Sequence, residues 1–124
     1  MTVKGFSMRP FLRNERDVVT LSPVEGVELR KGMVVLFRHR GKHVLHRYVD
    51  ERDGLCVMEG DGNYRTEEMA QREDVVAYVS EVRLEGGHRL AYDSVGWRRR
   101  SALSLMRKRM RTLVLDWKRK MIKR

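Results

Sequence analysis

The chain has 124 residues, 41% of them hydrophobic, with 27 Lys and Arg against 17 Asp and Glu, and a single cysteine. This length fits one small domain, and one cysteine excludes an intramolecular disulfide and argues against a thiolate metal cluster. No stretch approaches the roughly 18–20 apolar residues that a membrane-spanning helix needs, and the first residues lack the apolar run of a secretory signal. We therefore expect a cytoplasmic protein whose core is held by packing.

The positive charge is concentrated near the C-terminus. Residues 1–96 contain 15 basic and 16 acidic residues, whereas residues 97–124 contain 12 basic residues and one acid, Asp116. We therefore divide the chain into a near-neutral β domain, residues 1–92, and a basic tail, residues 93–124. The excess of positive charge bears on where the protein binds and not on its fold.

Short apolar runs separated by turn residues fill the near-neutral part. These runs cover residues 17–21, 33–37, 43–49, 55–58, 75–84 and 89–92. Gly41 marks a turn between the second and third runs, Asp53-Gly54 is typical of a type I′ hairpin turn, and Gly86-Gly87 precedes the last run. Strands at this spacing predict a mainly β fold, a compact antiparallel sheet or barrel.

The basic tail has the pattern of an amphipathic helix. Asp93-Ser94 is suited to the N-cap, and apolar residues then recur at steps of three and four. They are Leu103, Met106, Met110, Leu113, Val114, Trp117 and Met121, which we call the apolar stripe. On a helix the stripe occupies an arc of about 100°. Leu105 and Leu115 lie off the arc, which leaves room for a break near Thr112.

Three interpretations of the tail stay open at this point. The stripe packs on the β domain and leaves a solvated basic face, or the helix lies on an anionic membrane surface as a peripheral contact at the inner face. Trp97 and Trp117 near its two ends fit the second interpretation. Nucleic acid is the third, but no base-reading motif accompanies the basic residues, which argues against it.

Four segments of the near-neutral part carry candidate chemistry. They are residues 5–12 (GFSMRPFL), 17–19 (DVV), 44–49 (VLHRYV) and 60–63 (GDGN). Taken singly, a loop serine is usually a turn or capping residue, a strand histidine usually packs, and Asp-Gly-Asn usually forms a turn. In this order and spacing, however, they resemble the superfamily that joins signal peptidases with the self-cleaving LexA-type repressors.

The match to this superfamily is complete in some motifs and partial in others. The first motif is complete, and its residues are Gly5, Ser7, Met8, Pro10 and Leu12. The second has Arg16 where glycine is usual, and the third, residues 32–35, has Met33 where aspartate is usual. The resemblance covers about residues 3 to 80 and implies the LexA/signal peptidase type of β domain.

Leu45-His46-Arg47 resembles the histidine type of these enzymes, found in endoplasmic-reticulum and archaeal signal peptidases. The resemblance then implies Ser7 as nucleophile, His46 as its base and Asp61 as the acidic partner, with Gly5 and Met8 in the substrate and oxyanion region. Neutral imidazole can take a serine proton near pH 7, and a carboxylate on the far ring nitrogen would stabilise the imidazolium. The backbone N–H of Ser7 is the natural oxyanion donor.

The resulting expectation is a serine endopeptidase that cleaves a separate peptide or leader. Six residues precede Ser7, so we expect neither self-cleavage upstream of the serine nor an N-terminal membrane anchor. The alternative is a catalytically inactive binding module, with Arg16 and Met33 as marks of decay, whose basic tail binds an anionic membrane or nucleic acid. We expect no cofactor and no metal, because His39 and His43 have no cysteine or carboxylate at ligand spacing.

Overall fold

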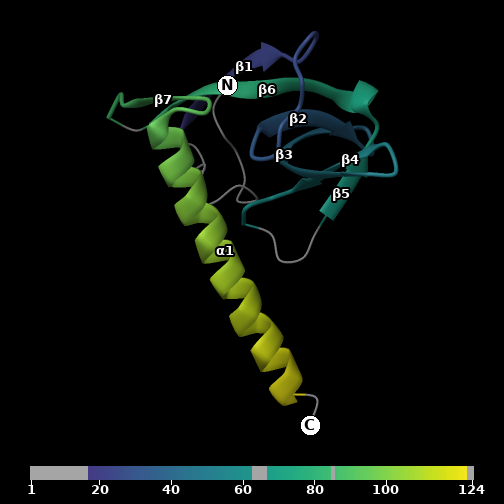
Figure 1. The fold of residues 1–124 in the computed structure, drawn as a ribbon, viewed down its shortest axis with the longest axis vertical. Coiled ribbons are helices and arrows are strands. Elements are labelled where there is room, and N and C mark those ends of the chain that lie inside the picture. Colours follow the sequence, from purple (N-terminus) through teal and green to yellow (C-terminus); the bar gives the residue numbers. More distant parts are fainter. Residues whose placement is uncertain (1–16, 63–66, 85, 123–124) are drawn as a thin grey trace.

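Short strands and one long helix make up the fold. The computed structural model describes residues 17–62, 67–84 and 86–122. The elements in chain order are β1 (Val18–Pro23), β2 (Val34–His39), β3 (Lys42–Arg52), β4 (Leu55–Glu59), β5 (Glu67–Ala70), the 3-10 turn η1 (Arg72–Asp74), β6 (Val75–Arg83), β7 (Arg89–Ala91) and α1 (Val95–Ile122). The predicted mainly β fold with a C-terminal helix is therefore confirmed (Figure 1).

All the strands belong to one antiparallel sheet in the order β1-β6-β2-β3-β4-β5. Strand β6 organises it, because one of its edges pairs with β1 while the other pairs first with β2 and then with β7. Among the described residues the outer strands β1 and β5 do not pair with each other, so the sheet is open and not a closed barrel. Strand β5 was not predicted, because its Glu67-Glu68 start lacks an apolar pattern.

The turns follow the glycine signals of the sequence. Asp53 and Gly54 have φ angles of 52° and 77°, as a type I′ turn requires, and they join β3 to β4. Arg40 and Gly41, with φ of 51° and 76°, join β2 to β3 in the same way. The predicted hairpins are thus confirmed, and they set the register that places residues 46 and 47 of β3 opposite β2.

Two hydrophobic clusters lie on the two faces of the sheet. Neighbouring residues of β2 separate between them, because side chains alternate along a strand: Val34 packs with Val79 and Val82, whereas Val35 packs with Phe37 on the other face. The second cluster also takes in Cys56, Met58 and Tyr48. Cys56 is buried, and burial raises its pKa.

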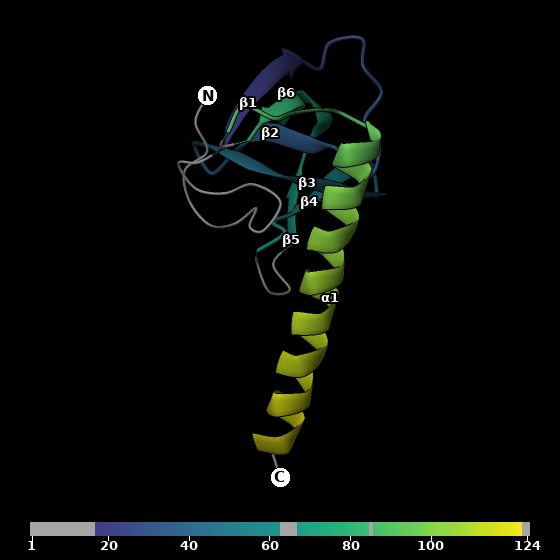
Figure 2. The same cartoon turned by 90° about the vertical axis from the view of Figure 1, so that its left-hand side faces the viewer.

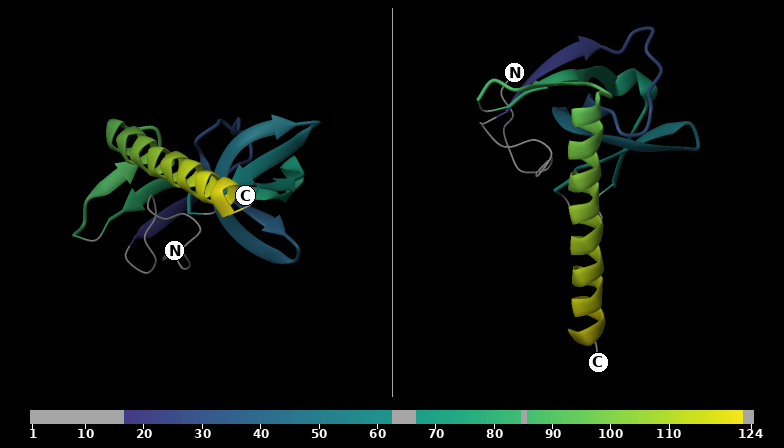
Figure 3. Two further views of the ribbon diagram at one scale, coloured as in Figure 1. Left: turned by 90° about the horizontal axis from the view of Figure 1, so that it is seen from below. Right: turned by 60° about the vertical axis from the view of Figure 1, so that its left-hand side comes forward.

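Helix α1 begins as the sequence predicts. The backbone N–H of Trp97 donates to Ser94 Oγ at 3.2 Å, so Ser94 is the N-cap. The helix then runs through Thr112 without a break, and its C-terminal half extends well beyond the sheet (Figures 1 and 2). In Figures 1 and 2 and in the right-hand view of Figure 3, that half has none of the described strands beside it.

The face of α1 that packs on the sheet is not the apolar stripe. Trp97, Ser101 and Ser104 face the sheet and are buried. The stripe is exposed: its least exposed residue, Val114, has 51% of its surface accessible, and its most exposed residue, Leu113, has 64%. The interpretation in which the stripe packs on the β domain is therefore wrong. Trp97 belongs to a core cluster and is not a surface anchor.

Candidate functional site

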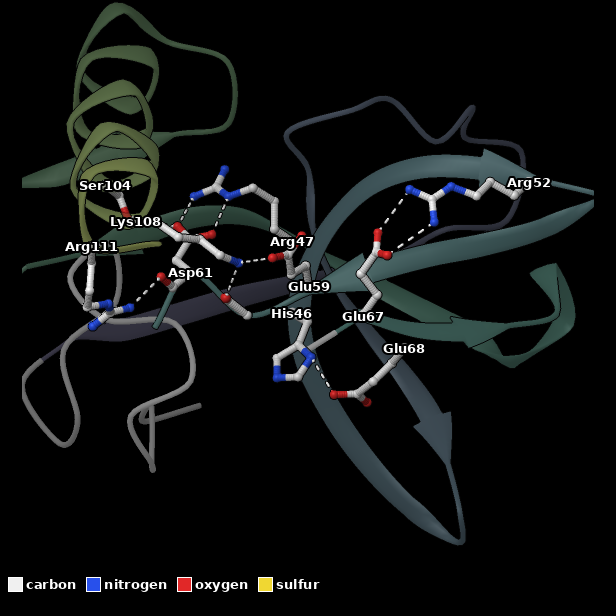
Figure 4. A network of polar contacts seen from close by, with 11 residues as sticks. His46, Arg47, Arg52, Glu59, Asp61, Glu67, Glu68, Ser104, Lys108 and Arg111 are labelled. Atoms are coloured by element: carbon white, nitrogen blue, oxygen red, sulfur yellow. Dashed lines mark hydrogen bonds and ion pairs between the residues drawn. The ribbon is translucent and has the colours of Figure 1, made fainter. Parts of the chain in front are cut away.

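Strand β3 carries His46 and Arg47 to opposite sides of the sheet, since consecutive side chains of a strand alternate (Figure 4). Both are buried, with 3% and 1% of their surface exposed. Buried charged and polar groups need partners. The two residues meet this need very differently.

Arg47 is fully engaged. Its Nε and Nη2 donate to the two carboxylate oxygens of Asp61 at 2.8 and 2.6 Å, a bidentate ion pair. Its Nη1 donates to the carbonyl of Gly32 at 2.8 Å and to Ser101 Oγ at 3.2 Å. Asp61 also accepts a hydrogen bond from Ser104 Oγ at 2.8 Å. This pair is a closed structural network.

Helix α1 holds the segment that carries Asp61. Lys108 Nζ donates to the carbonyl of Gly60 at 2.7 Å and pairs with Glu59, while Arg111 Nη2 reaches the carbonyl of Asp61 at 3.5 Å (Figure 4). Together with Ser101 and Ser104, these side chains form the inner face of α1. The inner face therefore fixes the Gly60-Asp61 turn against β3.

A second carboxylate, Asp17, is fully buried beside the same helix. Arg100 Nη2 lies 3.3 Å from Asp17 Oδ2. Like Gly32, whose carbonyl binds Arg47, Asp17 comes from one of the segments that carry the family resemblance. In the structure both residues contribute to holding the helix and β3 in place.

His46 has a sparser environment. Its Nδ1 lies 3.1 Å from Glu68 Oε1 on β5, within ion-pair distance, but the two groups are not aligned as a hydrogen bond. The ring packs against Phe37 at 6.0 Å between centroids. The other carboxylate oxygen of Glu68 lies 3.8 Å from His39 Nε2. Glu68 thus faces two histidines.

The environment of His46 favours its neutral form. Burial lowers the pKa of His46 below its ordinary value of 6.5, the nearby negative charge of Glu68 opposes this, and the positive charge of Lys108 lowers the pKa further. The net direction is downward. In the tautomer that has its proton on Nδ1, facing the Glu68 carboxylate, Nε2 is the ring atom that can accept a proton.

Of the predicted site residues, the structure describes His46 and Asp61 and places them with different partners. Ser7, Gly5 and Met8 lie outside the described residues. His46 and Asp61 are described, but the carboxylate within ion-pair distance of the His46 ring is that of Glu68, whereas both oxygens of Asp61 are bound by Arg47. The role of Asp61 as acidic partner stays a prediction, and Glu68 competes for it.

Sequence reasoning missed Glu68 and the inner face of α1. Glu68 lies in a short polar segment that carries no strand signal, so nothing in the sequence links it to His46. The inner face did have a signal, because Trp97, Ser101, Ser104 and Lys108 follow each other at steps of three and four. That line lies on the side of the helix opposite the apolar stripe.

Comparison with protein-family models, with curated proteins and with solved structures gives no match for this chain. Within residues 17–62, 67–84 and 86–122, no three His, Cys, Asp or Glu side chains are arranged to hold a metal ion. In that same part of the chain no helix is both long enough and apolar enough to cross a membrane. The functional argument therefore rests on the residues around His46.

Proposed function

We propose that the protein is a serine endopeptidase of the signal-peptidase-like type, which cleaves a separate peptide or leader in the cytoplasm with Ser7 as nucleophile and His46 as base. One observation carries the proposal: the imidazole of His46 is buried and its Nδ1 lies 3.1 Å from a carboxylate oxygen of Glu68. The sequence motif around Ser7 supplies the nucleophile.

In the proposed reaction Ser7 Oγ attacks the scissile carbonyl carbon while His46 Nε2 takes the proton of the Ser7 hydroxyl. The imidazolium then gives this proton to the leaving amine, and an acyl-enzyme is left on Ser7. Water, deprotonated by His46, hydrolyses the ester and restores both residues. The carboxylate of Glu68 stabilises the imidazolium in both steps, because it lies beside Nδ1.

Arg47 and Asp61 have a supporting part in this proposal. Their bidentate pair fixes β3 against the Gly60-Asp61 turn and so holds the backbone that carries His46. Serine peptidase chemistry needs its base held to within a fraction of an ångström. Asp61 is then a positioning residue for the proposed reaction.

The test is cleavage of a peptide library prepared from a digested proteome, with new termini identified by mass spectrometry. Wild type should cut a defined subset of peptides, and Ser7→Ala and His46→Gln should each lose this cleavage. His43→Gln is the matched control, because His43 lies exposed on the same strand and should cut like wild type. Undiminished cleavage by Ser7→Ala contradicts the proposal, and a wild type that cuts nothing favours the inactive binding module.

A further inference from the structure

The outer face of α1 is an uncovered apolar surface with basic borders. At 100° per residue the seven stripe residues from Leu103 to Met121 fall within about 100° of arc. Each is exposed by more than half of its surface. Arg107 and Lys118 lie just beyond one border of this arc, Arg109 and Lys120 lie just beyond the other, and all four are exposed. The helix therefore has an apolar centre flanked by positive charge on both sides.

The sheet does not obstruct this surface. The inner face of α1, which binds the sheet through Ser101, Ser104 and Lys108, points in the opposite direction from the stripe. Figure 2 and the right-hand view of Figure 3 show the helix extending past the sheet with its far half clear of the strands. The stripe therefore offers a contact surface along roughly 27 Å of helix, at 1.5 Å per residue.

We propose that the outer face of α1 binds the surface of an anionic membrane, with the helix lying in the plane of the interface and the β domain held on the aqueous side. The stripe enters the headgroup region, and its flanking Arg and Lys side chains pair with anionic lipid. Trp117 is exposed and lies near the middle of the stripe's arc, towards the C-terminal end of the helix. Its amphipathic ring suits an interface. This surface lies outside the proposed peptidase reaction.

The borders of the stripe decide between occupants. A second copy packed on the stripe would place the basic borders of the two helices against each other, so like charges would oppose the pairing. A nucleic acid would bind the arginines but would leave the apolar stripe in water, where it gains nothing. An anionic lipid surface satisfies the charges and the apolar side chains together.

The test is flotation of the full chain with vesicles of two compositions, phosphatidylcholine alone and equal parts of phosphatidylcholine and phosphatidylglycerol. Binding should require the anionic vesicles and should weaken as salt is raised. Tryptophan emission should shift to the blue on binding and should lose this shift in Trp117→Phe, because Trp97 is already buried. Ser7→Ala should bind like wild type, so a failed peptidase assay leaves this result unaffected.

Two paired variants locate the surface. Met110→Ser/Leu113→Ser should reduce the partition coefficient at least about tenfold, whereas Leu105→Ser, off the stripe on the same helix, should leave it near wild type. Arg107→Gln/Arg109→Gln should reduce it roughly thirtyfold, at about one kcal/mol per basic residue. Removing two charges from the exposed β2–β3 turn in Arg40→Gln/Lys42→Gln should change it little.

Three results would overturn the proposal. The first is equal binding to neutral and anionic vesicles, and the second is unchanged binding by Met110→Ser/Leu113→Ser. The third is no vesicle binding at all, together with either a stable dimer that the stripe variant disrupts or tight binding to duplex DNA that the stripe variant retains. Circular dichroism of each variant checks that the exposed substitutions leave the fold intact.

Discussion

Two neighbouring side chains of β3 have opposite environments. Within the described part of the chain, Arg47 donates two hydrogen bonds to Asp61, one to the carbonyl of Gly32 and one to Ser101 Oγ on α1. Among the described residues, Glu68 has the carboxylate that lies within ion-pair distance of the His46 ring, and His46 Nδ1 has no aligned hydrogen bond. A saturated network stabilises a fold, whereas a buried titratable group with spare capacity is typical of a functional site. The comparison supports a structural role for Arg47 and the role that we propose for His46.

The largest expected effect is a loss of stability when the charge partner of Arg47 is removed. Asp61→Asn leaves a buried guanidinium without its charge partner and should lower the free energy of unfolding by roughly 3–5 kcal/mol, measured by urea denaturation. Glu67→Gln is the matched control, because Arg52 also binds Glu67 through both oxygens, at 3.0 and 3.1 Å, but at the surface. Glu67→Gln should lower the free energy of unfolding by less than about 1 kcal/mol. Equal losses in the two variants would contradict the structural role of the Arg47–Asp61 pair.

On the His46 side the expected effect is on rate. Glu68→Gln should lower kcat for a cleaved peptide roughly 100-fold with little change in KM, because the imidazolium loses its carboxylate. Its stability should stay near that of wild type, unlike that of Asp61→Asn. A normal kcat in Glu68→Gln would mean that Glu68 is not the acidic partner and would return that role to Asp61.

A smaller loss is expected where α1 closes the Arg47 network. Ser104→Ala removes one of the donors to Asp61, whose bonds to Arg47 remain, and should cost about 1 kcal/mol of unfolding free energy. Ala102→Ser is the control, because it adds a hydroxyl at an exposed position of the same helix. A loss of 3 kcal/mol or more, roughly that of removing the charge partner, would show that the helix contact and not the ion pair holds the turn.

The smallest effect is the pH dependence of stability. The folded protein holds the pKa of His46 below the value of about 6.5 that it has in the unfolded chain. Below about pH 6.5 the unfolded chain therefore binds more protons, so stability should fall as the pH drops from there towards the folded pKa, and should be fully present above it. His46→Gln should lose this part of the pH dependence in urea titrations, whereas an identical profile in the variant would contradict it.

Local signals in the sequence predicted most of the fold. The turn at Asp53-Gly54 and the cap at Ser94 are confirmed, because each depends on residues adjacent in the chain. Strand β5 was missed because its structure comes from pairing with β4, which a polar four-residue segment does not reveal. Glu68 lies on β5, so it was missed together with the strand, and the carboxylate beside His46 could not be found from the sequence.

The orientation of α1 was mispredicted for a physical reason. An amphipathic pattern leads one to expect the apolar face to pack on the domain. The surface that the domain offers is polar, however, because the Arg47–Asp61 pair and the Gly60 carbonyl need hydrogen-bonding partners. Serine and lysine side chains of the inner face meet that need, so the inner face packs on the domain and the stripe remains exposed.

The most direct test of His46 as the base compares two pH titrations of the same protein. One follows the His46 ring protons by NMR, and the other follows kcat/KM for a cleaved peptide. We expect both to have a midpoint below 6.5, to move lower together in Glu68→Gln and to move higher together in Lys108→Gln, since these charges raise and lower the pKa of His46 respectively. An acid limb of kcat/KM that does not follow the His46 titration in these variants would contradict the account.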